Sequence, residues 1–248
     1  MGNFKICEYL RGEYELYRAR GPINVVIIGD SVSHGCFEIG KTDFNAVYHN
    51  RLRLMLNSKF GTIPVNMINT AIGGSSACFA LEYFDRDVLG HRPDLVIICF
   101  GLNDVNGDVE IYKSSLEGLF EKCKANDFDC IFMTPNMLNT YRSEETIAQY
   151  YDYALKTAEM QNSGRMDLFM EAAREVAAKC GVTLCDCYSV WKELEARGED
   201  ITALLINRIN HPTKEMHQLF ADMLYETIVG EKYDGEKLSC GDGMIKIN

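Results

Sequence analysis

The stretch NVVIIGDS, which runs from Asn24 to Ser31, decides the fold expected for this chain. Its apolar part, Asn24–Ile28, is rich in β-branched residues and too short for a helix, which predicts a buried strand. The strand leads directly into Gly29-Asp30-Ser31, where a turn would leave a serine hydroxyl at the carboxyl end of the strand. In parallel sheets covered by helices, ligands bind at that end of the strands.

Four more apolar runs follow the same pattern: Val65–Asn69, Leu95–Phe100, Cys130–Thr134 and Val182–Cys185. Short runs without polar alternation are typical of a parallel sheet with helices on both faces. Segments with helical spacing lie between or after them: Phe44–Phe60, Val109–Asn126, Met166–Cys180 and Thr213–Val229. The alternation predicts one three-layer α/β/α domain, residues 1–248, with a five-stranded parallel sheet.

Turn residues mark the ends of two of these helical segments. Pro212 suits the first turn of the last one, and Gly181 suits the end of the segment that closes at Cys180. No element is predicted after Gly230, where the sequence is polar and weakly patterned.

Composition excludes several classes of protein. With 47% hydrophobic and 25% charged residues, the 248-residue chain is neither disordered nor fibrous. The net charge of −11 argues against nucleic acid and acidic membranes as partners. Residues 1–20 hold no apolar stretch that would act as a secretory signal or a membrane span, so we expect a cytoplasmic protein.

The ten cysteines are expected to be reduced, because several lie inside apolar runs. Cys185 and Cys187 are two residues apart, and alternate positions on a strand face opposite ways, so we expect no metal site there.

Polar residues also follow the other strands. A glycine pair that ends at Gly74 follows the second run, and Gly101-Leu102-Asn103-Asp104 follows the third. His211 stands before the last helical segment, and histidine is the side chain best suited to move protons near neutral pH. Each feature alone is common in ordinary turns, helix caps and cores.

Taken together and in this order, Gly29-Asp30-Ser31, Gly74, Gly101-Leu102-Asn103-Asp104 and His211 resemble the SGNH, or GDSL-type, hydrolase family. The resemblance spans most of the chain. It implies a flavodoxin-like α/β/α esterase fold, no metal or cofactor, and a small-molecule acyl ester as substrate.

The resemblance also implies roles for individual residues. Ser31 would be the nucleophile and His211 the general base. The oxyanion hole would consist of the Ser31 N–H, the Gly74 N–H and the Asn103 side chain, with Asp30 and Asp104 in support. A small acyl group is preferred, such as the acetyl of a carbohydrate acetate.

One position departs from the family pattern. The family usually has an aspartate three residues before the histidine, where it orients the imidazole, and this chain has Arg208. Three alternatives remain open: a backbone carbonyl orients His211, a carboxylate from elsewhere does so, or the enzyme works as a Ser-His dyad.

Two other functions are compatible with parts of the sequence. Gly35–Thr42 formally matches a P-loop, but its first glycine does not directly follow the apolar run. The absent aspartate would also suit a catalytically silent member of the fold that binds a carbohydrate or acts as a scaffold. A nucleophile elbow is excluded, because the Gly-x-Ser-x-Gly pattern is absent and Ser33 stands at its last position.

Pocket walls are harder to predict. Phe37, Phe79 and Tyr141 are the aromatic candidates, and the long connection Asn136–Gly164 is a candidate lid or wall. His217 lies six residues after His211, so on one helix the two side chains would face different sides. We expect His217 to be a surface or a packing residue.

Overall fold

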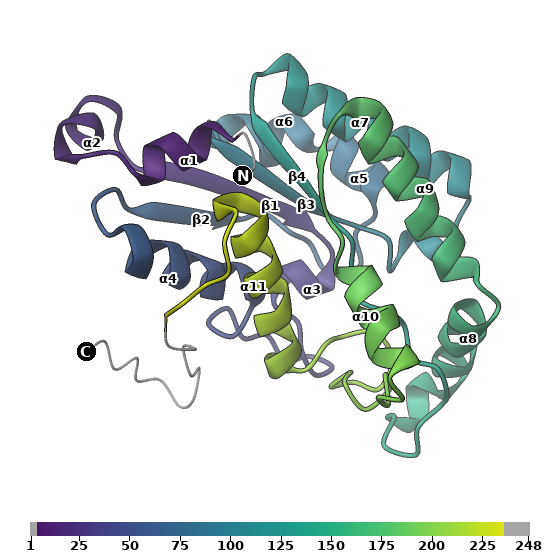
Figure 1. Cartoon of the computed structure of the whole chain (residues 1–248). Helices are drawn as coiled ribbons and strands as arrows, with labels where there is room; N and C mark the ends of the chain where they lie inside the picture. The colour runs from purple at the N-terminus through teal and green to yellow at the C-terminus, as the bar shows by residue number, and fades with distance from the viewer. Residues whose placement is uncertain (1–3, 236–248) are drawn as a thin grey trace.

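Five parallel strands form the sheet of the computed structural model, which describes residues 4–235 (Figure 1). The strands are β1 (Ile23–Gly29), β2 (Val65–Asn69), β3 (Leu95–Cys99), β4 (Asp129–Met133) and β5 (Thr183–Cys185). Their order is β2-β1-β3-β4-β5, which is the flavodoxin-like order. All five predicted runs are confirmed, with ends that differ by no more than one residue.

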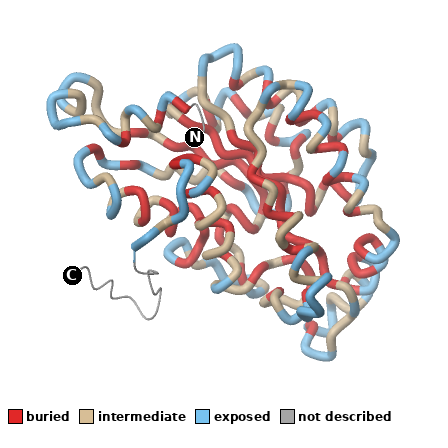
Figure 2. The backbone as a smooth tube through the Cα atoms, viewed as in Figure 1, coloured by how far each residue is buried: buried red, intermediate tan, exposed pale blue. Residues whose placement is uncertain are grey.

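Helices cover both faces of the sheet, as the three-layer prediction requires (Figure 1). Helices α4 (Tyr48–Phe60) and α11 (Lys214–Val229) pack together on one face, and α5 (Ala77–Glu82), α7 (Val109–Ala125) and α9 (Arg165–Cys180) lie on the other. Figure 2 shows the buried residues concentrated in the strands and the inward sides of these helices. Strands β1 and β3 are buried almost throughout, because they lie between other strands and between both helix layers.

Helix α4 begins at Tyr48 and not at Phe44, so the predicted start is wrong. The Asp43 side chain accepts hydrogen bonds from the N–H groups of Asn45 and Ala46, both at 3.0 Å. Such a local turn competes with helix formation, and the helical spacing in the sequence does not reveal it.

The last helix also begins later than predicted. Thr213 is the N-cap of α11 and its hydroxyl accepts from the N–H of Met216, so Pro212 lies outside the first turn. Gly181 ends α9 with a φ of 70°, as predicted for a helix C-terminus.

Several elements were not predicted, and most of them are short. The helices are α1 (Lys5–Leu10), α2 (Tyr14–Arg20), α3 (Ser31–His34), α6 (Phe84–Asp87), α8 (Tyr151–Asn162) and α10 (Cys187–Ala196), with 3-10 turns η1 (Leu89–His91), η2 (Asp104–Asn106) and η3 (Ala148–Tyr150). No helix in residues 4–235 is long and apolar enough to cross a membrane. The unassigned tail falls largely outside the described residues.

Strand order brings distant residues to one edge of the sheet. Strands β1 and β3 are paired so that Gly29 lies opposite Cys99, and each strand runs into a loop shortly afterwards. Helix α3, which begins one residue after β1, carries Ser31, and the loop after β3 carries Asn103. This boundary between β1 and β3 is the topological switch point, at which sheets of this order bind their ligands.

Candidate active site

Ser31 is the first residue of the single-turn helix α3, directly beyond β1. Asp30 caps this helix, because its carboxylate accepts from the N–H of Val32 at 2.9 Å. Gly29 is needed for close packing: a Cβ there would lie 2.4 Å from the Ser33 hydroxyl and 2.9 Å from the carbonyl of Cys99. The serine hydroxyl is thus fixed at the carboxyl end of β1.

His211 and Ser31 are 180 residues apart in sequence but hydrogen-bonded in the structure. The distance from His211 Nε2 to Ser31 Oγ is 2.9 Å. On its other side, His211 Nδ1 lies 2.7 Å from the carbonyl oxygen of Phe37. A carbonyl can only accept, so Nδ1 carries the proton and Nε2 accepts from the serine hydroxyl. This is the tautomer that a general base requires.

The Phe37 carbonyl is held by a small hairpin, residues 36–42. Cys36 and Thr42 form an antiparallel bridge, and the Phe37 N–H donates to the carbonyl of Lys41 at 3.1 Å. The Phe37 ring is 2% exposed and packs on the His217 ring, with centroids 4.7 Å apart. The prediction of Phe37 as a ligand-contacting wall is therefore wrong: its ring belongs to the core, and its backbone orients His211.

The geometry of this hairpin also argues against a P-loop at Gly35–Thr42. Gly35 follows helix α3 and not a strand, and the N–H groups of Phe37 and Lys41 donate within the hairpin. The Lys41 ammonium pairs with Glu38 at the surface. These N–H groups and the ammonium bond to other groups of the same segment. They therefore do not form the phosphate-binding loop that a P-loop protein requires.

Arg208 is directed away from the imidazole of His211. Its guanidinium pairs with Glu145 and donates to the carbonyls of Ala203 and Leu205. Of the three alternatives for orienting His211, the geometry matches the backbone carbonyl.

Asn207 is a positioning residue that was not predicted from the sequence. Its side-chain oxygen accepts from the N–H groups of Ile209, Asn210 and His211, each at 3.0 Å. This turn fixes the backbone that carries the imidazole. An asparagine four residues before the histidine is the only sequence signal, and asparagines are common in turns of every kind.

Two loops that were predicted to donate to an oxyanion are joined by a hydrogen bond. The Asn103 amide nitrogen, beyond β3, donates to the carbonyl of Ser75, beyond β2, at 2.8 Å. Gly74 has a φ of 78°, and a Cβ there would meet nothing within 4 Å, so the space around it is open. A Cβ on the adjacent Gly73 would lie 3.8 Å from the Cβ of Ser31. The glycine segment, Gly73–Gly74, therefore passes next to Ser31.

Asp30 and Asp104 are buried acids beneath this site. Burial raises the pKa of Asp30 to about 7 and that of Asp104 to about 6. Asp104 Oδ1 accepts from the N–H of Ala77 at 2.9 Å, which anchors the start of α5. Within the described part of the chain, the second carboxylate oxygen of each acid has no hydrogen-bond partner.

Burial also lowers the pKa of His211, and the hydrogen bond to Phe37 opposes that shift in part. A lowered pKa keeps the imidazole neutral, and hence able to accept a proton, over a wider range below neutrality.

His217 is a core residue. It lies inside α11, whereas His211 precedes that helix, so the expected shared helix is wrong. The ring of His217 is fully buried, and its Nδ1 accepts from the Tyr48 N–H at 3.1 Å. Of the two readings given for it, packing is confirmed and surface is wrong.

Cys185 and Cys187 also differ from the expectation. Their sulfurs lie 3.8 Å apart, because the strand ends at Cys185 and α10 begins at Cys187. The premise of opposite faces is wrong, since the chain turns at Asp186. Among residues 4–235, no group of three His, Cys, Asp or Glu side chains is placed to hold a metal ion.

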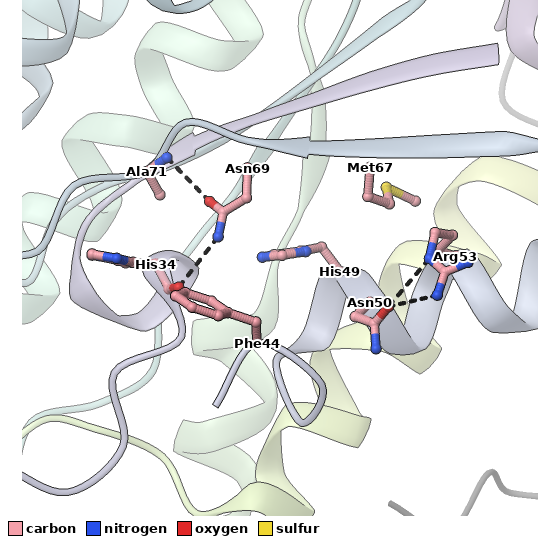
Figure 3. Close-up of a pocket in the computed structure, with 8 residues that line it drawn as sticks. All are labelled: His34, Phe44, His49, Asn50, Arg53, Met67, Asn69 and Ala71. Atoms are coloured by element: carbon pink, nitrogen blue, oxygen red, sulfur yellow. Dashed lines mark hydrogen bonds between the residues drawn. The ribbon is translucent and has the colours of Figure 1, made fainter. Parts of the chain in front are cut away.

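One cavity lies next to helix α3, and another lies next to His211. One, of about 380 Å³, lies against β2 and α4 and is shown in Figure 3. Its polar side chains bond to the protein: Asn69 joins His34 to Ala71, and Asn50 accepts from Arg53 (Figure 3). The other, of about 420 Å³, includes His211 in its lining.

The segment Asn136–Gly164 supplies a wall of this second cavity through Tyr150 and Tyr153, which were not singled out in the sequence. The other predicted wall residues lie elsewhere: Phe79 lines a separate small cavity, and the Tyr141 hydroxyl donates to Asp200 at 2.8 Å.

Comparison with known proteins points to one family. The sequence model of the GDSL-like Lipase/Acylhydrolase family matches residues 27–219, which include all the site residues named above from Gly29 to His211. Among curated proteins, none matches the chain.

Solved structures with the same fold include three esterases or hydrolases. LAE5, an alpha/beta hydrolase enzyme from the metagenome of Lake Arreo, Spain, is 23% identical, with a TM-score of 0.66 over 83% of this chain and 94% of that one. Axe2, an acetylxylan esterase from Geobacillus stearothermophilus, is 20% identical, with a TM-score of 0.67 over 85% and 95%. The acetyl xylan esterase AlAXEase is 18% identical, with a TM-score of 0.64 over 82% and 98%.

Proposed function

The chain belongs to the GDSL-like lipase/acylhydrolase family, and on that premise we propose that it hydrolyses an acyl ester through an acyl-enzyme on Ser31. The observation that carries the proposal is the chain of hydrogen bonds from Ser31 Oγ through the His211 ring to the Phe37 carbonyl. It contains a nucleophile, a base in the correct tautomer and a group that holds the base in place.

The reaction begins with attack of Ser31 Oγ on the ester carbonyl carbon, while His211 Nε2 takes the hydroxyl proton. The negative charge that forms on the carbonyl oxygen is stabilised by the N–H groups of Ser31 and Gly74 and by the amide of Asn103. The open space around Gly74 and the fixed Asn103 amide support this assignment. Collapse expels the alcohol, which receives the proton from His211. Water then releases the acid by the same steps.

The Phe37 carbonyl takes the place of the missing aspartate in this mechanism. It has no full charge, so it stabilises the imidazolium less than a carboxylate does, but it fixes the same tautomer. Asp30 and Asp104 support the site indirectly: Asp30 caps the helix that carries Ser31, and Asp104 anchors α5 beyond the glycine segment.

A small acyl group, such as acetyl, is the acyl part that we propose for the substrate. The fold shared with two acetyl xylan esterases makes a carbohydrate acetate the first substrate to test.

The proposal is tested with p-nitrophenyl acetate and an organophosphonate that labels activated serines. We expect turnover, and we expect mass mapping to place one label on Ser31. Ser33 is the matched control in the mass mapping. It should stay unlabelled, because its hydroxyl is buried and hydrogen-bonded to the Tyr48 hydroxyl at 2.9 Å. Absence of turnover and of label on the folded protein would instead favour a catalytically silent binding protein.

A further inference from the structure

The cavity of about 420 Å³ beside His211 lies between two segments that are far apart in sequence. One wall is the 36–42 hairpin, which also supplies the Phe37 carbonyl; the facing wall includes Tyr150 and Tyr153. Its volume falls within the range of roughly 300–1,000 Å³ that is typical of small-molecule sites.

The direction of proton transfer determines which half of an ester this cavity can receive. In the proposed reaction, His211 Nε2 delivers its proton to the oxygen of the departing alcohol. That oxygen must therefore lie on the histidine side of Ser31, whereas the carbonyl oxygen points to Gly74 and Asn103. A cavity lined by His211 is thus placed to hold the alcohol and not the acyl group.

We propose that this cavity is the leaving-alcohol subsite of the proposed esterase and that it accepts a neutral, hydroxylated ring such as a pyranose. The inference rests on the proposed function and adds to it the location and the chemistry of the alcohol site.

The lining matches such a ring in its apolar and polar parts. Tyr150 and Tyr153 offer half-buried aromatic surface, and Ile39 adds an aliphatic side chain, which suits the C–H face of a sugar. Asn210 is 8% exposed, and within residues 4–235 its side-chain NH₂ has no assigned acceptor, although its oxygen accepts from Asn207. That NH₂ is available to a ring hydroxyl.

Charge in the cavity favours a neutral ligand. The two charged residues of its lining, Glu38 and Lys41, form an ion pair with each other, 2.5 Å apart. A charged alcohol would gain no unpaired partner there. In the cavity of about 380 Å³ the Arg53 guanidinium is present, and His211 is absent from the lining.

The experiment compares two acetates that differ only in the alcohol: methyl β-D-xylopyranoside monoacetate and ethyl acetate. Xylopyranose is the probe because it is a pyranose without an exocyclic carbon, and ethanol is too small to span the cavity. The variant is Tyr150→Ala, and the matched control is Tyr151→Ala, whose ring packs under Arg142, 4.5 Å from its guanidinium carbon, and does not line the cavity.

We expect the ratio of kcat/KM for the sugar acetate to that for ethyl acetate to fall about tenfold in Tyr150→Ala, since loss of an aromatic contact to a ligand commonly has an effect of this size. The ratio in Tyr151→Ala should stay near that of the wild type. Competitive inhibition by unacetylated methyl β-D-xylopyranoside should weaken in Tyr150→Ala in parallel.

An unchanged ratio in Tyr150→Ala, or an equal fall in both variants, would overturn the subsite assignment while leaving the esterase proposal intact. Failure of the wild-type protein to turn over either acetate would count against the proposed function itself. A wild-type preference for ethyl acetate over the sugar acetate would also overturn the subsite.

Discussion

The Phe37 carbonyl oxygen lies 2.7 Å from Nδ1 of His211 and occupies the position at which a carboxylate would orient a catalytic histidine. The 36–42 hairpin makes this contact possible, because it returns the chain past the imidazole directly after the helix that carries Ser31. The nucleophile and the group that orients its base thus come from one short segment.

Removal of the Asn103 amide should slow the chemical step. We expect Asn103→Ala to lower kcat by about 10² to 10³, because one oxyanion donor is lost. Asn106→Ala is the control: Asn106 ends the 3-10 turn η2 that follows Asn103 and donates to the Asn103 carbonyl at 3.1 Å. The assay is p-nitrophenyl acetate hydrolysis, with near-ultraviolet circular dichroism to check the fold. An equal loss of activity in both variants would indicate loop damage and contradict the oxyanion role.

The pH dependence of activity follows from the burial of His211. Its pKa is lowered from the ordinary 6.5, so the neutral base should persist below that pH and kcat/KM should fall only at lower pH. The measurement is kcat/KM as a function of pH, repeated in Asp30→Asn to remove the carboxyl that has a pKa of about 7. A rising limb centred above 6.5 in both proteins would be inconsistent with His211 as the base.

Restoring the family aspartate should not increase activity. The side chain at position 208 is directed away from the imidazole, and the Nδ1 proton of His211 already goes to the Phe37 carbonyl, so the carboxylate of Arg208→Asp would find no free donor on the ring. Arg208 has a φ of 58°, a conformation that aspartate tolerates better than most residues, so the variant is expected to fold. Steady-state kcat for p-nitrophenyl acetate is the readout. A clear increase in kcat would mean that the carbonyl orients the base inadequately in the natural protein.

Asp30 should make the protein less stable as pH rises. The folded protein keeps a proton on this carboxyl up to about pH 7, whereas the unfolded chain releases it near 3.8, so stability falls across that window. Asp30→Asn retains an acceptor for the Val32 N–H and carries no charge. Its Tm should therefore decline less than that of the wild type as pH rises from 3.8 to 7.

The comparison of the two Tm curves also corrects for other titrating groups. Burial lowers the pKa of His49 to about 4, which makes stability rise with pH between about 4 and 6.5. That contribution is the same in both proteins and cancels in the difference. Parallel Tm curves would show that Asp30 is not protonated in the folded state.

Much of the fold was predictable because buried strands leave a strong pattern. Runs such as Leu95–Cys99 are apolar on both faces, and their spacing indicated both the sheet and its helical layers. Helix α8 was missed because its pattern is weak, and the start of α4 was misplaced because the Asp43 turn depends on side-chain hydrogen bonds. Competition between such a side-chain hydrogen bond and the helix leaves no trace in the spacing of apolar residues.

The contact between Ser31 and His211 was expected from motif order, and the structure brings the two residues together. The group that orients His211 was not predictable, because a backbone carbonyl has no residue type to recognise. Tyr150 and Tyr153 were not predicted for a different reason. Their place in the cavity depends on how the long connection Asn136–Gly164 folds back toward the 36–42 hairpin.

A main-chain oxygen is supplied by every amino acid, so substitution at position 37 can leave the contact to His211 chemically intact as long as the hairpin keeps its shape. Homologues that lack the acidic residue before the histidine should therefore not be classed as pseudoenzymes on that ground alone. The length and closure of the loop after the serine would be the better criterion for sorting active from inactive sequences.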